Sequence, residues 1–332
     1  MQSIEAALPL LNEPRKIFIT THHKPDGDAI GSMLALYHYL TARGHDVTAV
    51  SPSDVPAFLA WMPGCDKLVN YEAQSDKAKA ALNKADIIFG LDFNDFSRTK
   101  HMDDMLKEAP QPKIMLDHHL HPADYWQYGI SRSDKSSTCE VVYDFINVCG
   151  DNAMITKDMA SCMYVGAMTD TGSFRFPATT ASVHLMIADL MGRGIDHTRI
   201  HEEVYDSWSE SRMRFLGYVL IERMKVYRKY NAALITLSRK DMQLFNVQNG
   251  DTEGLVNYPL SIAGVRFATL ITERADEVKM SFRSKGLFDV SNFARLHFNG
   301  GGHFNASGGR STMSFEETIS HFERILSDIH PK

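Results

Sequence analysis

Short apolar runs alternate with longer stretches that we predict as helices in the first part of the chain. Four strands are predicted at residues 17–19, 45–51, 85–92 and 113–119, and all but the second are apolar runs of the kind seen in strands buried on both faces. The predicted helices lie at residues 29–40, 137–148 and 156–168. Ser137 (or Ser136) is a suitable N-cap of the second, and Thr156 begins the third. Strands that alternate with helices predict an α/β fold with a doubly wound, mostly parallel sheet.

The pattern changes after about residue 181. Residues 181–224 are helical in pattern, and strands are predicted at 232–237, 265–272 and 278–283. A glycine-rich loop at 300–309 precedes a final helix that starts at Ser314. We therefore expect a first domain at 1–190, a helical linker at 191–225, and a smaller α/β domain with a mixed sheet at 226–332.

Acidic and imidazole side chains follow the ends of the predicted strands in the first domain. They are His22, Asp26 and Asp28 after the first strand, Asp92 after the third, Asp117, His118 and His119 after the fourth, and Asp170 after a long apolar helix. A single aspartate at such a position is usually a cap or a turn residue. Several carboxylates at one sheet edge repel each other unless a positive charge lies between them. A mixed Asp/His set suits Mn²⁺ best, with Mg²⁺ as a weaker candidate.

The charge distribution argues against tracking along long nucleic acid and suits a cluster of carboxylates held together by divalent cations. The whole chain of 332 residues has 35 basic and 41 acidic residues and a net charge of −6. Residues 226–332 have 13 basic and 11 acidic residues, so residues 1–225 carry a net charge of −8. Tracking along long nucleic acid needs many basic phosphate contacts, which an acidic first domain does not offer.

Cysteine usage and hydropathy predict a cytoplasmic protein without a membrane span. Residues 1–13 have no basic start typical of a signal peptide, and no apolar run approaches the ~18 residues that a membrane span needs. The four cysteines form no CxxC pair, which is typical of a reduced, intracellular protein. They are Cys65, Cys139, Cys149 and Cys162.

The ordered motifs resemble those of the DHH phosphoesterase family. The matching motifs are His22-x-x-Pro25-Asp26-Gly27-Asp28, Asp92, Asp117-His118-His119 and Asp170-Thr171-Gly172. Gly300-Gly301-Gly302-His303, with Ala306 and Gly308, resembles the DHH-associated C-terminal domain. The resemblance covers nearly the whole chain. The length and domain plan of the chain resemble those of hydrolases of short oligoribonucleotides that also remove phosphate from 3′-phosphoadenosine 5′-phosphate (pAp).

The resemblance implies two divalent cations bound in the first domain. It assigns one ion to His22, Asp26 and Asp92, and the other to Asp28, Asp92, His118 and Asp170. Asp92 would bridge the two ions, which could share and activate a water molecule. Asp117 would orient a histidine, and His119 would face the phosphate of the substrate.

The same resemblance implies substrate contacts in the second domain. By itself the glycine-rich segment is more typical of a structural turn, but the family match makes Gly301, Gly302 and His303 candidate substrate contacts. Arg283 matches the basic strand position of the family, and a guanidinium group can bind phosphate in a bidentate manner. Arg98 and Arg175 are weaker candidates.

We therefore predict a metal-dependent phosphodiesterase and phosphomonoesterase that acts on short RNA or nucleotide bisphosphates. An inorganic pyrophosphatase or exopolyphosphatase is the main enzymatic alternative, because the same catalytic motifs serve those reactions. A long single-strand exonuclease of the RecJ kind shares the motifs, but the chain has no spare length for an additional nucleic-acid-binding domain. A non-catalytic nucleotide-binding sensor is the alternative outside enzymes. The preferred substrate among short RNA, pAp and linear dinucleotides, and the formation of oligomers, stay open at this stage.

Overall fold

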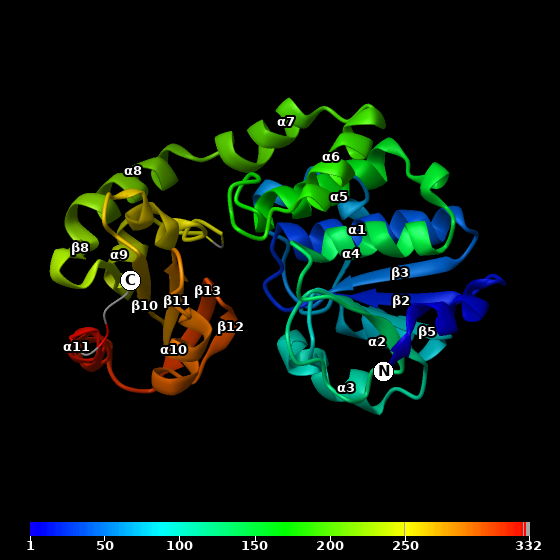
Figure 1. Cartoon of the computed structure of the whole chain (residues 1–332). Helices are drawn as coiled ribbons and strands as arrows, with labels where there is room; N and C mark the ends of the chain where they lie inside the picture. The colour runs from blue at the N-terminus through cyan, green and yellow to red at the C-terminus, as the bar shows by residue number, and fades with distance from the viewer. Residues whose placement is uncertain (249, 328, 330–332) are drawn as a thin grey trace. The chain divides into compact units, whose positions relative to one another are not determined.

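The computed structural model describes residues 1–248, 250–327 and 329. The chain divides into two compact units, Met1–Ser207 and Trp208–Lys332, which are described separately below (Figure 1). The domain limits at residues 190 and 225 stay a prediction. The end of the predicted second domain, residues 330–332, lies outside the described residues.

The first unit is built on a seven-stranded sheet in which every pair of neighbouring strands is parallel. Its spatial order is β1-β7-β6-β5-β2-β3-β4. The strands are β1 (Gln2–Ser3), β2 (Lys16–Thr20), β3 (Asp46–Ser51), β4 (Val69–Asn70), β5 (Ile87–Leu91), β6 (Lys113–Asp117) and β7 (Tyr128–Ser131). The four predicted strands form its centre, whereas the short strands β1, β4 and β7 were not predicted.

Helices cover both faces of this sheet (Figure 1). Ile17 and Ile19 of β2 pack in one core with α1 (Gly27–Ala42), α4 (Thr138–Val148) and α5 (Lys157–Asp170). Phe18, which points to the opposite face, packs in a second core with α2 (Ser75–Lys84) and α3 (Asp103–Glu108). Side chains alternate between the faces of a strand, so a strand buried on both faces is apolar throughout. The doubly wound α/β prediction is confirmed.

Two predicted helix starts are confirmed by their caps. The Ser137 hydroxyl accepts a hydrogen bond from the Glu140 amide at the start of α4. The Thr156 hydroxyl accepts one from the Met159 amide at the start of α5. Each cap satisfies a backbone N–H that has no partner within the helix.

The helical stretch predicted for residues 181–224 is helical but interrupted. It contains α6 (Ala181–Gly192), α7 (His197–His201), the π-helical turn η6 (Glu202–Asp206), α8 (Glu210–Tyr218) and a second π-helical turn, η7 (Val219–Arg223). Gly194 has a φ of +79°, which ends α6, and Asp196 caps α7. None of the helices in the described part of the chain has the length and apolar character needed to cross a membrane.

Short 3₁₀ turns connect the remaining parts of both units. They are η1 (Ile4–Leu11), η2 (Ala57–Leu59), η3 (Cys65–Lys67), η4 (Phe96–Met102), η5 (Asn152–Met154), η8 (Arg228–Tyr230) and η9 (Leu255–Ser261). Of these, η4 begins four residues after Asp92, shortly beyond the end of β5.

The second unit contains a six-stranded mixed sheet with the order β12-β13-β11-β10-β9-β8. β9 and β10 are parallel, and all other neighbours are antiparallel. The strands are β8 (Met224–Tyr227), β9 (Ala232–Leu237), β10 (Phe267–Glu273), β11 (Val278–Ser284), β12 (Gly301–His303) and β13 (Ala306–Ser311). The predicted mixed sheet is confirmed, with β9 at its predicted residues.

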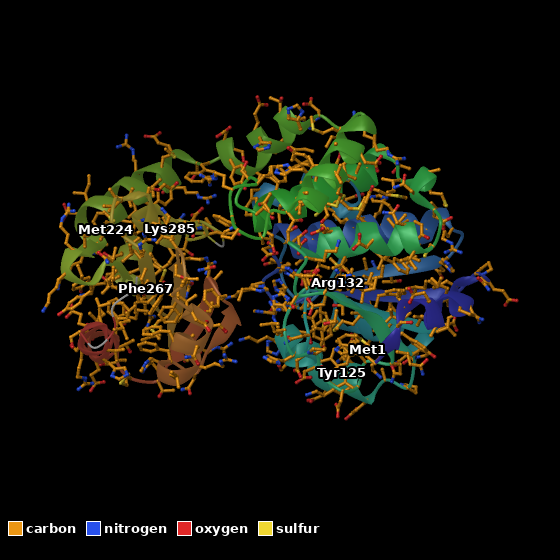
Figure 2. All side chains as sticks on the ribbon, viewed as in Figure 1. Met1, Tyr125, Arg132, Met224, Phe267 and Lys285 are labelled. Carbon is orange, nitrogen blue, oxygen red and sulfur yellow. The ribbon has the colours of Figure 1, made fainter. Side chains whose placement is uncertain are left out.

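Aromatic rings form much of the core on one face of this sheet. Phe267 of β10, labelled in Figure 2, lies 5.2 Å from Phe293 and 6.0 Å from Phe322 between ring centroids. These two residues belong to α10 (Val290–His297) and α11 (Phe315–Leu326). α11 begins after Ser314, as predicted, and Ser314 forms a reciprocal capping box with Glu317. The short helix α9 (Arg239–Leu244) is capped in the same way by Ser238.

The expectation of a glycine-rich loop before a helix was wrong, because the segment forms a β-hairpin of β12 and β13. Gly301 pairs with Gly308, and His303 pairs with Ala306. A Cβ atom on Gly300 would lie 2.0 Å from the carbonyl oxygen of Gly308. Gly302 has a φ of +145° and leaves no room for a side chain beside Ala306. The glycines therefore allow two backbones to approach closely.

Candidate metal centre

The candidate site lies where the strand order of the first sheet changes direction. From β2 the chain continues to β3 on one side and later returns to β5 on the other side. Ligands of open α/β sheets bind at the carboxyl ends of strands at such a switch point. His22, Asp92 and His118 follow the carboxyl ends of β2, β5 and β6.

One group of possible ligands consists of His22, Asp26 and Asp92. Nε2 of His22 lies 3.4 Å from Oδ2 of Asp92 and 3.9 Å from Oδ2 of Asp26. Asp26 is the N-cap of α1, and its Oδ1 accepts the amides of Asp28 and Ala29. This cap fixes the carboxylate so that its second oxygen faces His22.

A second group consists of Asp28, Asp92 and His118, with Asp170 beside it. Nε2 of His118 lies 3.4 Å from Oδ1 of Asp92, 3.9 Å from Oδ2 of Asp28 and 3.5 Å from Oδ2 of Asp170. Asp28 is fully buried in the first turn of α1, and Asp170 is the last residue of α5. Asp92 thus belongs to both groups and directs one oxygen toward each.

The histidine rings are oriented as metal-binding imidazoles usually are. Nδ1 of His22 lies 3.0 Å from the carbonyl oxygen of His23, which places a proton on Nδ1. Nδ1 of His118 similarly faces the carbonyl oxygen of Lys135 at 3.4 Å. In the neutral tautomer, each Nε2 lone pair then faces carboxylate oxygens, and only a proton or a cation between them removes the repulsion. This donor set fits divalent cations.

The pKa values of the buried carboxyl groups are shifted because several charges are crowded together. Burial, together with the charge of Asp92, raises the pKa of Asp28 to about 7. Burial and the charges of Asp28 and Asp26 also raise the pKa of Asp170 well above its usual value. Burial alone would raise the pKa of Asp92, but hydrogen bonds that Nε2 of His118 and of His22 donate when these rings are protonated hold it well below its usual range. Asp92 is therefore the carboxylate that stays charged most readily.

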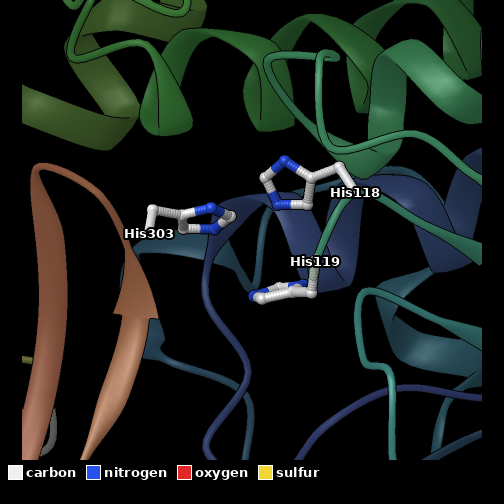
Figure 3. Close-up of side chains that lie close together, drawn as sticks. All are labelled: His118, His119 and His303. Atoms are coloured by element: carbon white, nitrogen blue, oxygen red, sulfur yellow. The ribbon is translucent and has the colours of Figure 1, made fainter. Parts of the chain in front are cut away.

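The remaining residues of the Asp117-His118-His119 motif form a pair beside Asp92. Nδ1 of His119 lies 2.8 Å from Oδ1 of the buried Asp117 and 3.6 Å from Oδ1 of Asp92. Figure 3 shows the rings of His118 and His119, which are nearly perpendicular at 79° and are 4.8 Å apart. Asp117 thus orients the ring of His119, whereas His118 is directed toward the carboxylates of Asp28 and Asp170.

The candidate substrate residues of the second unit share one face of its sheet. Arg283 of β11 and His303 of β12 both lie directly opposite Ala306 of β13. Directly opposite residues on neighbouring strands point to the same side of a sheet. His303, also labelled in Figure 3, and Arg283 are therefore presented on one surface of this unit. Gly301 lies on the same strand as His303, one residue beyond Gly302.

Two residues near the candidate centre were missed or set aside in the sequence analysis. Thr138 donates hydrogen bonds to both Asp28 and Asp92, although only its neighbour Ser137 carried a recognisable signal as an N-cap. Arg98 lies on η4 and donates from a guanidinium nitrogen to the carbonyl oxygen of Asp92 at 3.3 Å. Neither contact is encoded in a local sequence pattern. Arg175, the other weak candidate, donates to the carbonyl oxygen of Gly172.

Comparisons with known proteins agree with this arrangement. An exopolyphosphatase-related protein from Bacteroides fragilis has a solved structure that matches with a TM-score of 0.92 and 41% sequence identity. The match covers 98% of this chain and 95% of that chain. A model of the DHH family, N-terminal domain, matches residues 16–167, and a model of the DHHA1 domain matches residues 240–328. The chain belongs to the DHH family.

Relatives within this family include enzymes with two activities. A protein of Thermus thermophilus named bifunctional oligoribonuclease and PAP phosphatase NrnA is 29% identical over 94% of this chain and 89% of its own length. The structure of RecJ from the same organism, in complex with Mn²⁺, matches with a TM-score of 0.53 and 11% identity. That match covers 98% of this chain and 55% of RecJ, and it supports the shared fold. This DHH protein is thus a phosphoesterase by family.

Proposed function

We propose that this DHH protein hydrolyses short oligoribonucleotides to mononucleotides, removes phosphate from pAp, or does both, with two divalent cations. The observation that carries the proposal is the position of Asp92, whose two oxygens face separate His/Asp groups. The NrnA protein of Thermus thermophilus, similar over most of both chains, supports this choice of substrates. Mn²⁺ is the expected metal because the donor set mixes imidazole and carboxylate, with Mg²⁺ as the second candidate.

The chain offers one set of ligands for each cation. His22, Asp26 and Asp92 would hold one, and Asp28, Asp92, His118 and Asp170 would hold the other. Two such ions supply a water molecule of lowered pKa and stabilise negative charge on the phosphate oxygens. The burial of Asp28, Asp92 and His118 excludes bulk water from these ligands and so strengthens their interactions with cations.

Residues outside the two ligand sets position the phosphate and the substrate in this proposal. His119, held at Nδ1 by Asp117, contacts the phosphate that is cleaved. Arg283 and His303 bind a second phosphate or the nucleotide through the shared face of the second sheet. Gly301 and Gly302 allow the backbone of β12 to approach the same ligand, since they carry no side chain.

Turnover of four substrates in the presence of Mn²⁺ tests the proposal. The substrates are pAp, a 5′-phosphorylated diribonucleotide, an RNA 24-mer and inorganic pyrophosphate. We expect kcat/KM to be highest for pAp or the diribonucleotide. A higher kcat/KM for the 24-mer would contradict the preference for short substrates, and no turnover of any phosphoester would contradict the enzyme assignment.

Hydrolysis of inorganic polyphosphate or pyrophosphate is the second candidate function. It is favoured by the similarity to the exopolyphosphatase-related protein of Bacteroides fragilis at 41% identity. In that case pyrophosphate, or inorganic polyphosphate added as a fifth substrate, would be cleaved with the highest kcat/KM, and turnover of nucleotide substrates would not depend on the base. The comparison of these five substrates therefore separates the two candidates.

A further inference from the structure

The first turn of α4 contacts two of the proposed ligands from outside the metal groups. The amide of Thr138 donates to Oδ2 of Asp28 at 2.6 Å, and the amide of Cys139 donates to Oδ1 at 2.9 Å. The hydroxyl of Thr138 donates to Oδ1 of Asp92 at 3.0 Å. Thr138 therefore connects the carboxylate of Asp92, which follows β5, with that of Asp28 in α1.

We propose that Thr138 is a positioning residue that presets Asp28 and Asp92 in the orientation required to bind the cations. This inference rests on the metal assignment within the proposed function. Asp92 needs such support because its φ of +61° is in the left-handed region, where residues with a side chain are seldom found. Its carbonyl oxygen is held separately by Arg98 at 3.3 Å. The hydroxyl of Thr138 is thus the group on α4 that holds the side chain of Asp92 in place.

The position of Thr138 is itself fixed by a buried network. Glu140, 1% exposed, accepts the amide and hydroxyl of Ser136 at 2.9 and 3.0 Å, and it accepts Nζ of Lys135 at 3.0 Å. The hydroxyl of Ser182 on α6 also donates to Glu140. These contacts hold the segment before α4 in place. Thr138 is 0% exposed and has little freedom to rotate away from Asp92.

The side chain of Thr138 is suited to this role because it can donate a hydrogen bond without carrying a charge. A hydrogen bond from the hydroxyl to one oxygen of Asp92 orients the carboxylate but leaves its negative charge available to cations. A lysine at this position would instead compete with a bound metal. The hydrogen bonds from the amides of Thr138 and Cys139 likewise orient the carboxylate of Asp28 and leave its charge available to cations.

Three variants test the proposal. Thr138→Val removes the hydroxyl but keeps the shape and both amides, and Thr138→Ser retains the hydroxyl. Thr99→Val is the matched control, because Thr99 is also 0% exposed and its hydroxyl donates to the carbonyl oxygen of Phe96, not to a proposed ligand. Mn²⁺ affinity by isothermal titration calorimetry is the main measurement. The melting temperature of the metal-free proteins reports the loss of stability separately.

We expect Thr138→Val to weaken Mn²⁺ binding about 10- to 100-fold, as loss of contacts to metal ligands typically does. Thr138→Ser should restore affinity to within about 3-fold, and Thr99→Val should melt at a lower temperature with unchanged Mn²⁺ affinity. Unchanged affinity in Thr138→Val, or equal losses in the Val and Ser variants, would overturn the positioning role of Thr138 but leave the metal assignment intact. A wild-type protein that binds no Mn²⁺ would overturn the metal assignment and this inference with it.

Discussion

Asp92 combines an uncommon backbone conformation with contacts on both carboxylate oxygens. Its φ is +61°, and it is 3% exposed. Aspartate and asparagine tolerate this region better than most residues because their short polar side chains can form local hydrogen bonds. The residue therefore fits a position where the chain turns sharply after β5 and where the carboxylate must face two groups of ligands.

Replacing Asp92 by asparagine should cause a larger loss than removing a ligand that serves one group. Asparagine keeps the shape and the tolerance for positive φ but removes the charge that would attract both cations. We expect Asp92→Asn to lose both bound Mn²⁺ ions and to lower kcat about 100-fold or more, whereas His22→Ala should retain one ion. Metal analysis per chain and steady-state kinetics measure both effects. Near-wild-type turnover in Asp92→Asn would exclude it as the shared ligand.

Arg283 should affect nucleotide binding more than the chemical step. A charge-assisted phosphate contact contributes roughly 1.5–3 kcal/mol, so Arg283→Ala should lower kcat/KM about 10- to 150-fold, mainly through KM. Bis-p-nitrophenyl phosphate has no second phosphate for this contact, and its hydrolysis should change much less.

Arg274→Ala is a suitable control for Arg283→Ala. Arg274 follows the end of β10, at the opposite end of the β10–β11 hairpin from Arg283. Its replacement should leave kcat/KM for nucleotides unchanged. Equal losses on nucleotide and bis-p-nitrophenyl phosphate in Arg283→Ala would indicate a structural or catalytic role for the arginine.

At the scale of elements, the close packing of α1, α4 and α5 brings the acidic side chains together. Gly31 of α1 and Gly166 of α5 leave space for the side chain of Cys139 on α4. A Cβ atom on Gly31 would lie 3.0 Å from Sγ of Cys139 and 2.5 Å from the carbonyl oxygen of Cys162. The helices can therefore approach closely enough for the first turn of α4 to reach Asp28.

Gly166→Ala should disturb both stability and metal binding. The new methyl group would lie 2.2 Å from Sγ of Cys139 and 2.7 Å from Oδ1 of Asp28. Such overpacking costs about 1–3 kcal/mol of unfolding free energy, and the displaced Asp28 should bind Mn²⁺ more weakly. Urea unfolding and calorimetric Mn²⁺ titration measure the two effects.

Gly192→Ala provides the matched comparison on α6. Among the described residues, apart from those of its own helix turn, no atom lies within 4 Å of the added Cβ atom there, so we expect unchanged or slightly higher stability and unchanged Mn²⁺ affinity. If Gly166→Ala behaved in the same way as Gly192→Ala, the packing of α4 against α1 and α5 would not position Asp28.

At the scale of the whole molecule, charge and architecture differ between the two parts of the chain. Residues 1–225 carry a net charge of −8, and the proposed ligands all lie in the first unit. Each unit has its own sheet and hydrophobic cores. Cation binding should therefore stabilise the first unit in particular, since the carboxylates repel each other without a counter-charge.

Removal of metal should lower the melting temperature. Mn²⁺ at about 100 times its dissociation constant should stabilise the native state by about 2.7 kcal/mol per site, or roughly 5 to 10 °C for a unit of this size. Differential scanning calorimetry with EDTA and with Mn²⁺ measures the shift. Asp92→Asn, which should lose both ions, should show a much smaller shift, and an identical melting temperature of the wild type in both conditions would contradict metal binding.

The sequence by itself determined the parts of the fold that depend on neighbouring residues. The buried strands β2, β5 and β6 follow from continuous apolar runs. The cap Ser137 predicts the start of α4, and the helical patterns that begin at Thr156 and Ser314 predict the starts of α5 and α11. The motif order also indicated the family. These signals are local, because periodicity and capping involve residues only a few positions apart.

Only the tertiary structure decided contacts between residues far apart in the chain. Thr138 reaches Asp28 across 110 positions and Asp92 across 46, and no sequence pattern records such a pairing. The β12–β13 hairpin was mistaken for a loop because its glycines carry no hydrophobic alternation. The two-residue strands β1 and β4 are too short for a periodic signal, and they form because the edges of an existing sheet offer backbone hydrogen bonds.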